Sequence, residues 1–252
     1  MLRPSRPKAD RAGHPLIAGL EPEAAALLRR HLRRGERRRG DLLSSAGHSI
    51  QTVFFISDGL VALFGRAPDG GTAATGIVGP GGFVGVSAAL SAQHPAERDA
   101  VALTGVQAQA IDAEALDRIA TLHPELRRRL MLYANDRIIQ ATQLCVCTAL
   151  HTVEQRLARW LLEAYALRGD RPIELTHQQL SDLLGVRRAS VTLGLHMLEG
   201  EQAVRCQRGR IEIRDLDALA RRSCGCHLAA SGRSERAYPA LSSASSTDNP
   251  RD

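Results

Sequence analysis

The spacing of apolar positions along the chain changes from helical to strand-like and back to helical. Leu28 and Leu32 stand at helical spacing behind Pro22, which suits the first turn of a helix, so residues 21–32 are predicted to be helical. From residue 39 to residue 111 the apolar runs are short and separated by glycines. This pattern predicts several short strands in a sandwich or barrel.

Two of these apolar runs, residues 53–56 and 60–64, flank the triplet Ser57-Asp58-Gly59. A turn-forming segment between two runs of strand-forming residues is typical of a β-hairpin. We therefore expect the two runs to pair with each other as neighbouring antiparallel strands.

Helical spacing returns in the second half of the chain. A short helix is predicted at residues 114–122, a long one from Pro124 to about Leu150, and another at residues 152–167. The long helix carries a narrow seam at alternating steps of four and three residues, which suits close packing against a partner helix. Packing against the chain's own β domain is the alternative. The seam consists of Ala134, Ile138, Ala141, Cys145 and Thr148.

Residues 175–199 predict two short helices joined by a tight turn. Thr176 and Gln179 have capping-box spacing, so the first helix is expected to begin at this point. Gly185 permits a sharp turn, and the second helix buries one face and keeps a polar outer face. This is the helix-turn-helix arrangement, in which the second helix enters the major groove of DNA.

A β-hairpin is predicted directly after the second helix. Apolar and polar residues alternate in residues 204–207 and 210–213, and Arg208-Gly209 provides a turn between them. Arginines on such a wing are suited to contact phosphates beside the groove. For each arginine taken singly, a solvated surface charge is the more common explanation. The combination of helix, turn, helix and wing is what predicts DNA binding.

Several motifs in these segments resemble the Crp/Fnr family of transcription regulators, over a region from about Leu16 to Arg222. The resemblance implies an α+β fold: an N-terminal β-roll, like a double-stranded jelly roll, a long dimerisation helix and a C-terminal winged helix-turn-helix. The motifs are Val53-Phe-Phe-Ile-Ser-Asp-Gly-Leu-Val61, Gly82-Phe-Val-Gly85, Leu180-Ser-Asp-Leu-Leu-Gly-Val-Arg-Arg-Ala-Ser-Val-Thr192 and His196-Met-Leu-Glu199.

Five segments follow from this resemblance and from the composition of the two ends. They are a flexible arm at 1–15, a cyclic-nucleotide-binding-like sensor β-roll at 16–123, the dimerisation helix at 124–150, the winged helix-turn-helix at 151–222 and a tail at 223–252. The tail is rich in Ser, Ala and Arg and has few large apolar residues, so it is predicted to be disordered.

The resemblance also implies a homodimer that binds double-stranded DNA, with RNA polymerase as a further partner if the protein activates transcription. It places His177 and Gln178 near the DNA backbone and Arg188, Ala189 and Leu193 at base-reading positions. Cyclic-AMP-binding members carry an acidic residue and an arginine where this chain has Ala189 and Leu193, so its target sequence is expected to differ. The residues expected at the DNA are Thr176, His177, Gln178, Arg187, Arg188, Ala189, Ser190, Thr192, Leu193, His196, Arg205 and Arg208.

A ligand pocket is implied by the same resemblance, but two of its expected residues are replaced. Val86 stands where family members that bind cyclic nucleotides have a glutamate for the ribose, and Asp99 stands where they have a hydroxyl for the phosphate. The sequence therefore argues against cyclic AMP. It leaves open a β-roll without a ligand and one with an unknown small-molecule effector. The expected pocket residues are Gly82, Gly85, Val86, Arg98 and Asp99.

The five cysteines bear on metal chemistry. None precedes Cys145, which argues against an N-terminal iron–sulfur cluster of the Fnr type, so no cofactor is identified. Cys145 and Cys147 lie two residues apart on a helix and point to different sides. A thiol- or metal-responsive protein is the alternative function, and its candidate ligands are Cys206, Cys224, Cys226 and His227.

Composition excludes other classes of protein. Only 3% of the 252 residues are aromatic, too few for a surface that stacks single-stranded bases. The net charge is +6, but eleven Lys and Arg lie in residues 1–40, outside the helix-turn-helix, so the total charge carries little information. No nucleophile–base pair, carboxylate pair or phosphate loop occurs at a meaningful spacing, so we expect no enzyme. The absence of a secretory signal and of a membrane span predicts a cytoplasmic protein.

Overall fold

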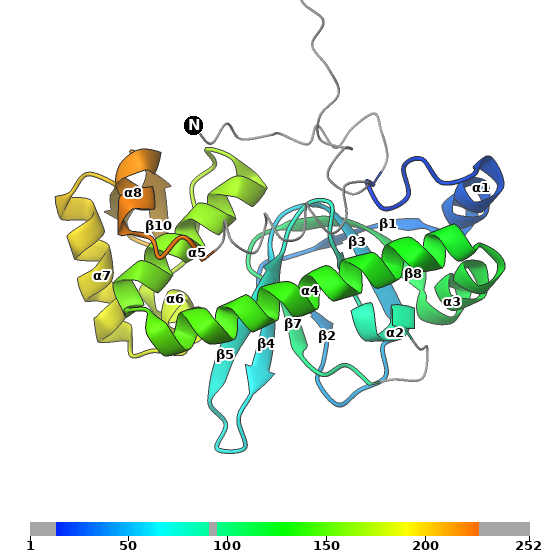
Figure 1. Ribbon diagram of the computed structural model, residues 1–252, viewed down its shortest axis with the longest axis horizontal. Coiled ribbons are helices and arrows are strands. Elements are labelled where there is room, and N and C mark those ends of the chain that lie inside the picture. The colour runs from blue at the N-terminus through cyan, green and yellow to red at the C-terminus, as the bar shows by residue number, and fades with distance from the viewer. Residues whose placement is uncertain (1–13, 91–94, 227–252) are drawn as a thin grey trace, which may run out of the picture.

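The computed structural model describes residues 14–90 and 95–226. Within this part of the chain, the first half folds into a β-roll of two four-stranded antiparallel sheets (Figure 1). One sheet has the strand order β1-β8-β3-β6 and the other has the order β2-β7-β4-β5. The strands are β1 (Arg33–Arg37), β2 (Leu42–Ser44), β3 (Thr52–Asp58), β4 (Val61–Arg66), β5 (Thr72–Val78), β6 (Phe83–Val84), β7 (Asp99–Ala102) and β8 (Val106–Asp112).

The hairpin predicted between β3 and β4 is wrong, because these two strands lie in different sheets. β3 pairs with β8 and β6, whereas β4 pairs with β5 and β7. The corner between them is tight: Gly59 has φ +90°, and a Cβ atom on it would lie 2.3 Å from the Gly105 carbonyl oxygen. The N–H of Leu60 donates to Thr104 Oγ1 over 3.0 Å and holds the chain where it crosses between the sheets. The long-range pairings of β7 and β8 therefore decide which strands are neighbours.

Successive side chains of β3 enter two separate cores. Phe54 lies in the core between the two sheets, whereas Phe55 lies in a core that the helices share. There Phe55 packs near Phe83 with 5.6 Å between ring centroids, and Phe83 packs on Tyr133 with 4.5 Å between centroids. The helices that close this core are α1 (Pro22–His31), α2 (Val86–Leu90), α3 (Ala113–Leu122) and the first turns of α4 (Pro124–Leu150).

Helix α4 connects the β-roll to the C-terminal domain and crosses the whole front of the molecule in Figure 1. It covers the predicted residues, Pro124–Leu150, and its 27 residues make a rod of about 40 Å. Of the predicted seam, Ala134 is buried within its own chain, whereas Ile138, Cys145 and Thr148 are exposed. The helix therefore packs on its own β domain with one face and leaves much of the seam uncovered.

The C-terminal domain is the predicted winged helix-turn-helix. Its core is continuous with the outer side of β4 and β5, because Leu60, Ala62 and Ile77 pack with side chains of its helices. None of the helices in the described ranges combines the length and apolar character needed to cross a membrane. The expected arm and tail fall largely on residues 1–13 and 227–252, which lie outside the described residues. The elements are α5 (Val153–Arg168), α6 (His177–Leu184), α7 (Arg188–Gly200), β9 (Val204–Gln207), β10 (Arg210–Ile213) and α8 (Leu216–Arg222).

Candidate nucleic-acid interface and effector pocket

Local sequence fixes the geometry of the two helices in the turn motif. Thr176 and Gln179 form the predicted capping box at the start of α6, with each side chain bonded to the other residue's backbone N–H. Gly185 ends α6 in the left-handed conformation at φ +62°, which lets the chain turn sharply into α7. The turn rests on β5, because a Cβ atom on Gly185 would lie 2.9 Å from the Cβ of Ala73. The motif is therefore held by its own caps and by the β-roll.

Helix α7 has one buried face and one exposed face, as predicted. Val191, Leu195 and Leu198 are fully buried, whereas the opposite face is open to solvent. No side chain caps the start of the helix at Arg187, so its first backbone N–H groups have no side-chain acceptor. Arg187, Arg188, Ala189, Leu193 and His196 are exposed, and Ser190 and Thr192 are partly so.

One predicted DNA-contacting pair makes a bond within the protein. His177 Nδ1 lies 2.9 Å from Thr192 Oγ1, and the Thr192 hydroxyl also lies 3.1 Å from the Arg188 carbonyl oxygen, to which it can donate. Burial, followed by the charges of Arg188 and His196, lowers the pKa of His177. The pair thus links the start of α6 to the exposed face of α7. Thr176 and Gln178 are exposed beside it.

The wing forms with the predicted register. β9 and β10 pair antiparallel, and Gly209 makes the turn at φ +71°. Arg205 and Arg208 are exposed. Arg210 is exposed as well but is bonded to Glu212, which partly neutralises it. Arg205 and Arg208, which form no ion pair in the described part of the chain, therefore add positive charge beside the exposed face of α7.

The five residues expected in the effector pocket do not lie together. Gly85, Val86 and Arg98 line a cavity of about 30 Å³, the volume of roughly one water molecule. Gly82 instead borders a separate cavity of about 310 Å³ between the β-roll, α4 and α5. Asp99, the first residue of β7, lines neither of these two cavities.

Asp99 has its own structural role. Its carboxylate pairs with Arg66 and accepts the backbone N–H of Ala46 over 2.9 Å. Burial raises the pKa of Asp99, but these hydrogen bonds and the Arg66 charge outweigh burial and lower it overall. The Asp99 carboxylate is therefore engaged by Arg66 and Ala46 within the protein, and its repulsion of a phosphate stays a prediction. The side chain of Val86 still lacks the acceptor that a glutamate would offer to a ribose hydroxyl.

Comparison with known proteins agrees with both halves of the chain. Residues 35–123 match the cyclic nucleotide-binding domain family, and residues 155–222 match the Crp-like helix-turn-helix domain family. The chain belongs to the Crp/Fnr family of transcription regulators. It is a regulator and not an enzyme, as the sequence predicted.

Relatives of this Crp/Fnr regulator match it over most of their length. A CRP-like cAMP-activated global transcriptional regulator of Mycobacterium tuberculosis is 28% identical over 84% of this chain and 97% of its own. The nitrogen fixation regulation protein FixK of Bradyrhizobium diazoefficiens is 28% identical over 68% of this chain and 75% of its own. The structure of FixK2 from Bradyrhizobium japonicum has the same fold, with a TM-score of 0.66, 17% identity and coverage of 77% and 98% of the two chains.

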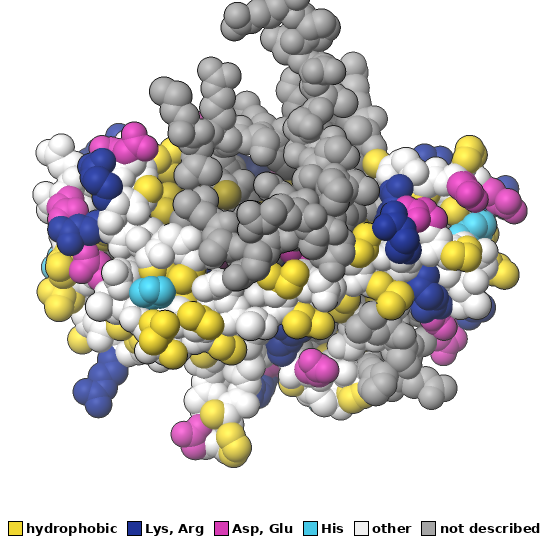
Figure 2. All heavy atoms as spheres, in the orientation of Figure 1, with side chains coloured by type: hydrophobic (Ala, Val, Ile, Leu, Met, Phe, Trp, Pro, Cys, Tyr) yellow, Lys and Arg dark blue, Asp and Glu magenta, His cyan; other side chains and the backbone are white. Residues whose placement is uncertain are grey.

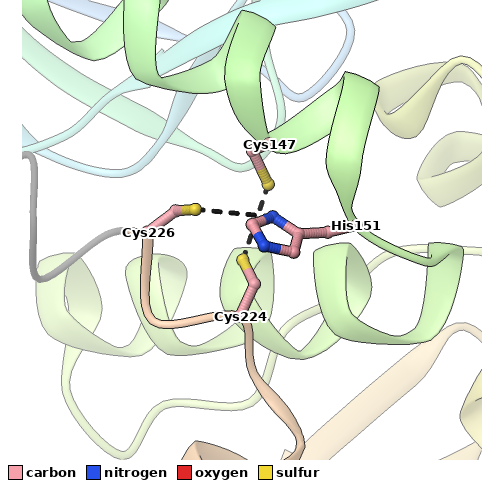
Figure 3. Close-up of side chains that lie close together, drawn as sticks. All are labelled: Cys147, His151, Cys224 and Cys226. Carbon is pink, nitrogen blue, oxygen red and sulfur yellow. Dashed lines mark hydrogen bonds between the residues drawn. The ribbon is translucent and has the colours of Figure 1, made fainter.

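The predicted metal ligands of this Crp/Fnr regulator are only partly brought together. Cys224 and Cys226 lie side by side, but Cys206 is in strand β9, where burial raises the pKa of its thiol to about 11. Cys206 as a fourth ligand is therefore wrong, and His227 lies outside the described residues. The two other potential ligands beside Cys224 and Cys226 are residues at the end of α4, Cys147 and His151 (Figure 3).

Sequence reasoning overlooked Cys147 and His151 as a pair, although a signal was present. Their spacing of four residues places both side chains on one side of a helix. Cys145, by contrast, is exposed on another side, as the sequence predicted. The sequence separation of 77 positions between Cys147 and Cys224 concealed the pairing, because only the tertiary fold brings α4 to the end of α8.

Proposed function

We propose that this regulator is a homodimer that reads a specific sequence of duplex DNA through α7, with the wing on the flanking phosphates. The observation that carries the proposal is the exposed face of α7, which presents Arg188 and Leu193 together and has an uncapped N-terminus. Such a function requires access to chromosomal DNA and therefore a cytoplasmic location.

Each exposed group has a suitable partner on DNA. Arg188 can donate two parallel hydrogen bonds to a guanine, and Leu193, 63% exposed, can contact a thymine methyl group. The start of α7, which has no side-chain cap, suits a phosphate oxygen, since the N-terminus of a helix attracts anions. Arg205 and Arg208 suit phosphates beyond the groove. Base contacts thus come from α7, and positioning contacts come from its N-terminus and the wing.

The exposed face of α4 supports the homodimer. Met131, Ile138 and Leu150 are 55%, 63% and 74% exposed, and Figure 2 shows hydrophobic side chains along the front of this helix. A second copy of the same helix covers such a face symmetrically, because the contact is self-complementary in a two-fold dimer. Two copies of α7 would then lie in successive major grooves, about 34 Å apart, on a palindromic site.

We propose that cyclic AMP is not an effector of this regulator, whether its β-roll binds another small molecule or none. The cavity at Gly85 and Val86 holds about 30 Å³, whereas ligand pockets usually enclose roughly 300 Å³ or more. Val86 has no acceptor for a ribose hydroxyl. Isothermal titration with cyclic AMP is therefore expected to give no saturable heat, and micromolar binding would contradict this part of the proposal.

Selection of binding sites from fragmented genomic DNA tests the function as a whole. We expect enrichment of a two-fold symmetric motif with half-site centres about one helical turn apart. The purified protein should protect that motif from nuclease cleavage at concentrations that leave unrelated DNA of equal length unprotected. Equal binding to both DNAs would refute sequence-specific recognition, and a motif without two-fold symmetry would refute the dimer.

A further inference from the structure

Four potential metal ligands from two distant parts of the chain lie together beside the short connection between α4 and α5. Cys147 lies in the last turn of α4, and His151 directly follows that helix. Cys224 and Cys226 follow α8 at the end of the winged domain. In Figure 3 the three sulfur atoms and the imidazole ring point toward one common centre. Cys147 and Cys226 are buried and the other two are partly buried.

The distances within this cluster suit one small ion. The four donor atoms all lie within 4.8 Å of one another. Cys147 Sγ is 3.5 Å from Cys224 Sγ, and Cys226 Sγ is 3.5 Å from His151 Nδ1. Tetrahedral bonds of about 2.3 Å to sulfur and 2.0 Å to nitrogen place ligand atoms roughly 3.5–3.8 Å apart. Thiolates that surround a four-iron cluster lie farther apart than this, since the cluster itself must fit between them.

The backbone favours the approach of two of these ligands. Gly225, between Cys224 and Cys226, has φ +68°, a conformation that side-chain-bearing residues rarely adopt. This turn brings the side chains of Cys224 and Cys226 to the same centre. In an extended strand the two side chains would lie on one side but farther apart. The helical spacing of Cys147 and His151 does the same for the other pair.

The surrounding charge suits an anionic metal complex. A divalent ion with three thiolates and one neutral imidazole carries a single net negative charge. The guanidinium groups of Arg156 and Arg159 lie near enough to the thiols to interact with them electrostatically. Among the described residues, the Nε atom of each arginine is buried without a hydrogen-bond partner. Arg159 already pairs with Glu163 over 2.8 Å, so the thiolates would chiefly compensate the charge of Arg156.

We propose that Cys147, His151, Cys224 and Cys226 form a closed tetrahedral Zn²⁺ site that ties the end of the winged domain to the end of α4. Three sulfur ligands and one nitrogen ligand match the preference of Zn²⁺, and four protein ligands leave no position for a substrate. Binding converts three thiols to thiolates and releases three protons to solvent, while the histidine binds in its neutral form. The proposal stands on these ligands alone and does not depend on DNA binding.

The location gives the metal a mechanical role. The ion would link two segments that are 77 residues apart, Cys147 and Cys224, across the joint where the sensor side meets the DNA-binding side. A link of this kind fixes the direction in which the winged helix leaves α4. In the proposed homodimer, the ion would thereby contribute to the relative placement of the two α7 helices without contacting DNA.

The first experiment measures metal in the full-length protein, purified without added metal or chelator. Inductively coupled plasma mass spectrometry should find about one zinc ion per chain. The variants Cys147→Ser, His151→Ala and Cys224→Ser/Cys226→Ser should each lower this ratio at least tenfold. Cys145→Ser and Cys206→Ser are matched controls, since Cys145 is on the same helix and Cys206 in the same domain, and both should keep the zinc.

A second measurement covers the case in which a ligand variant fails to fold. Protein stripped of zinc and supplied with Co²⁺ should show the visible absorption of tetrahedral cobalt together with a near-ultraviolet thiolate-to-cobalt band, both reversed by Zn²⁺. The proposal would be overturned if Co²⁺ produced no such absorption bands in metal-free protein. A disulfide between any two of the three cysteines in the freshly purified chain would also overturn it. Zinc retained by all ligand variants would place it elsewhere and overturn it too.

Discussion

Arg171 holds Asp58 in a two-pronged ion pair that joins the winged domain to the β-roll. Arg171 Nη1 donates to Asp58 Oδ2 over 3.0 Å, and Nη2 donates to Oδ1 over 2.8 Å. This parallel geometry is the strongest that arginine makes with a carboxylate. The hydrogen bonds from Arg171 hold the pKa of Asp58 below its usual range. Together with the contact of Gly185 on Ala73, the pair biases one placement of the helix-turn-helix on β5.

The substitution Asp58→Asn should loosen this placement at little cost in global stability. Both side chains are nearly half exposed, so the loss should be under about 1 kcal/mol. Because the pKa of Asp58 is lowered in the folded state, its contribution is present above the ordinary pKa and is lost as the pH falls below it. Hydrogen exchange at neutral pH should be faster in α6 and β5 of the variant. Asp69→Asn, in the exposed turn between β4 and β5, should leave exchange at α6 unchanged; equal effects would contradict the prediction.

Arg188 and Arg208 should differ in what their loss does to DNA binding. Arg188→Ala should weaken binding to the selected site by about 1–3 kcal/mol and leave binding to unrelated DNA nearly unchanged, because a base contact is lost. Arg208→Ala should weaken both by similar factors and lower the salt dependence, because a phosphate contact is lost. Fluorescence anisotropy on both DNAs at two salt concentrations measures this. Uniform loss in Arg188→Ala would rule out its base-reading role.

Ile138→Asp should convert the proposed homodimer to monomers. Ile138 is 63% exposed in the single chain, so the substitution should not disturb the fold, but it would place two carboxylates against each other across a two-fold axis. Sedimentation velocity measures the change in mass, and circular dichroism checks the fold. Leu42→Asp, at an exposed leucine of β2 away from α4, is the control and should remain dimeric. An unchanged mass in Ile138→Asp would mean that α4 is not the interface.

His14 should make the fold sensitive to acid well above the pH at which carboxylates titrate. Its ring is buried and neutral, with Nδ1 accepting the N–H of Leu16 over 3.3 Å and Nε2 3.1 Å from the Gly82 carbonyl oxygen. Burial lowers the pKa of His14 from 6.5 to about 4, against the opposing effect of the Gly82 bond. The unfolded chain therefore binds the proton first, and stability falls as the pH drops from 6.5 toward 4.

The loss over this range should be about 3 kcal/mol, since each pKa unit corresponds to about 1.4 kcal/mol. Chemical denaturation at a series of pH values should show the decline in the native protein and a flatter profile in His14→Gln. His48→Gln, at an exposed histidine, is the control and should follow the native profile. Identical profiles for all three proteins would contradict the assignment to His14.

Sequence patterns predicted the helical half closely because its boundaries are set by local chemistry. Pro124 can begin α4 without losing a bond, and Thr176 with Gln179 supplies the caps that start α6. Gly185 has the left-handed conformation that few other residues adopt. Each of these signals acts within four residues of its effect, so the sequence alone was sufficient to place α4, α6 and α7.

The strands and the pocket were predicted less well, for a physical reason. Asp58-Gly59 is compatible with a hairpin and with a corner between sheets, and only the distant partners β7 and β8 decide between the two. The family resemblance placed Asp99 beside Arg98 in the pocket, yet Asp99 lines neither cavity and pairs instead with Arg66, 33 positions away in the chain. Both errors came from reading neighbours in sequence as neighbours in space.

The sequence by itself determined the order of the helical and strand-rich segments, the register of the wing and an exposed polar face on α7, since these depend on local spacing and caps. Only the tertiary structure decided which strands share a sheet and that Asp99 forms an ion pair with Arg66. It also brought Cys147 and His151 next to Cys224 and Cys226. Those relationships join residues far apart in the chain, and only the packing of complete elements brings them within bonding distance.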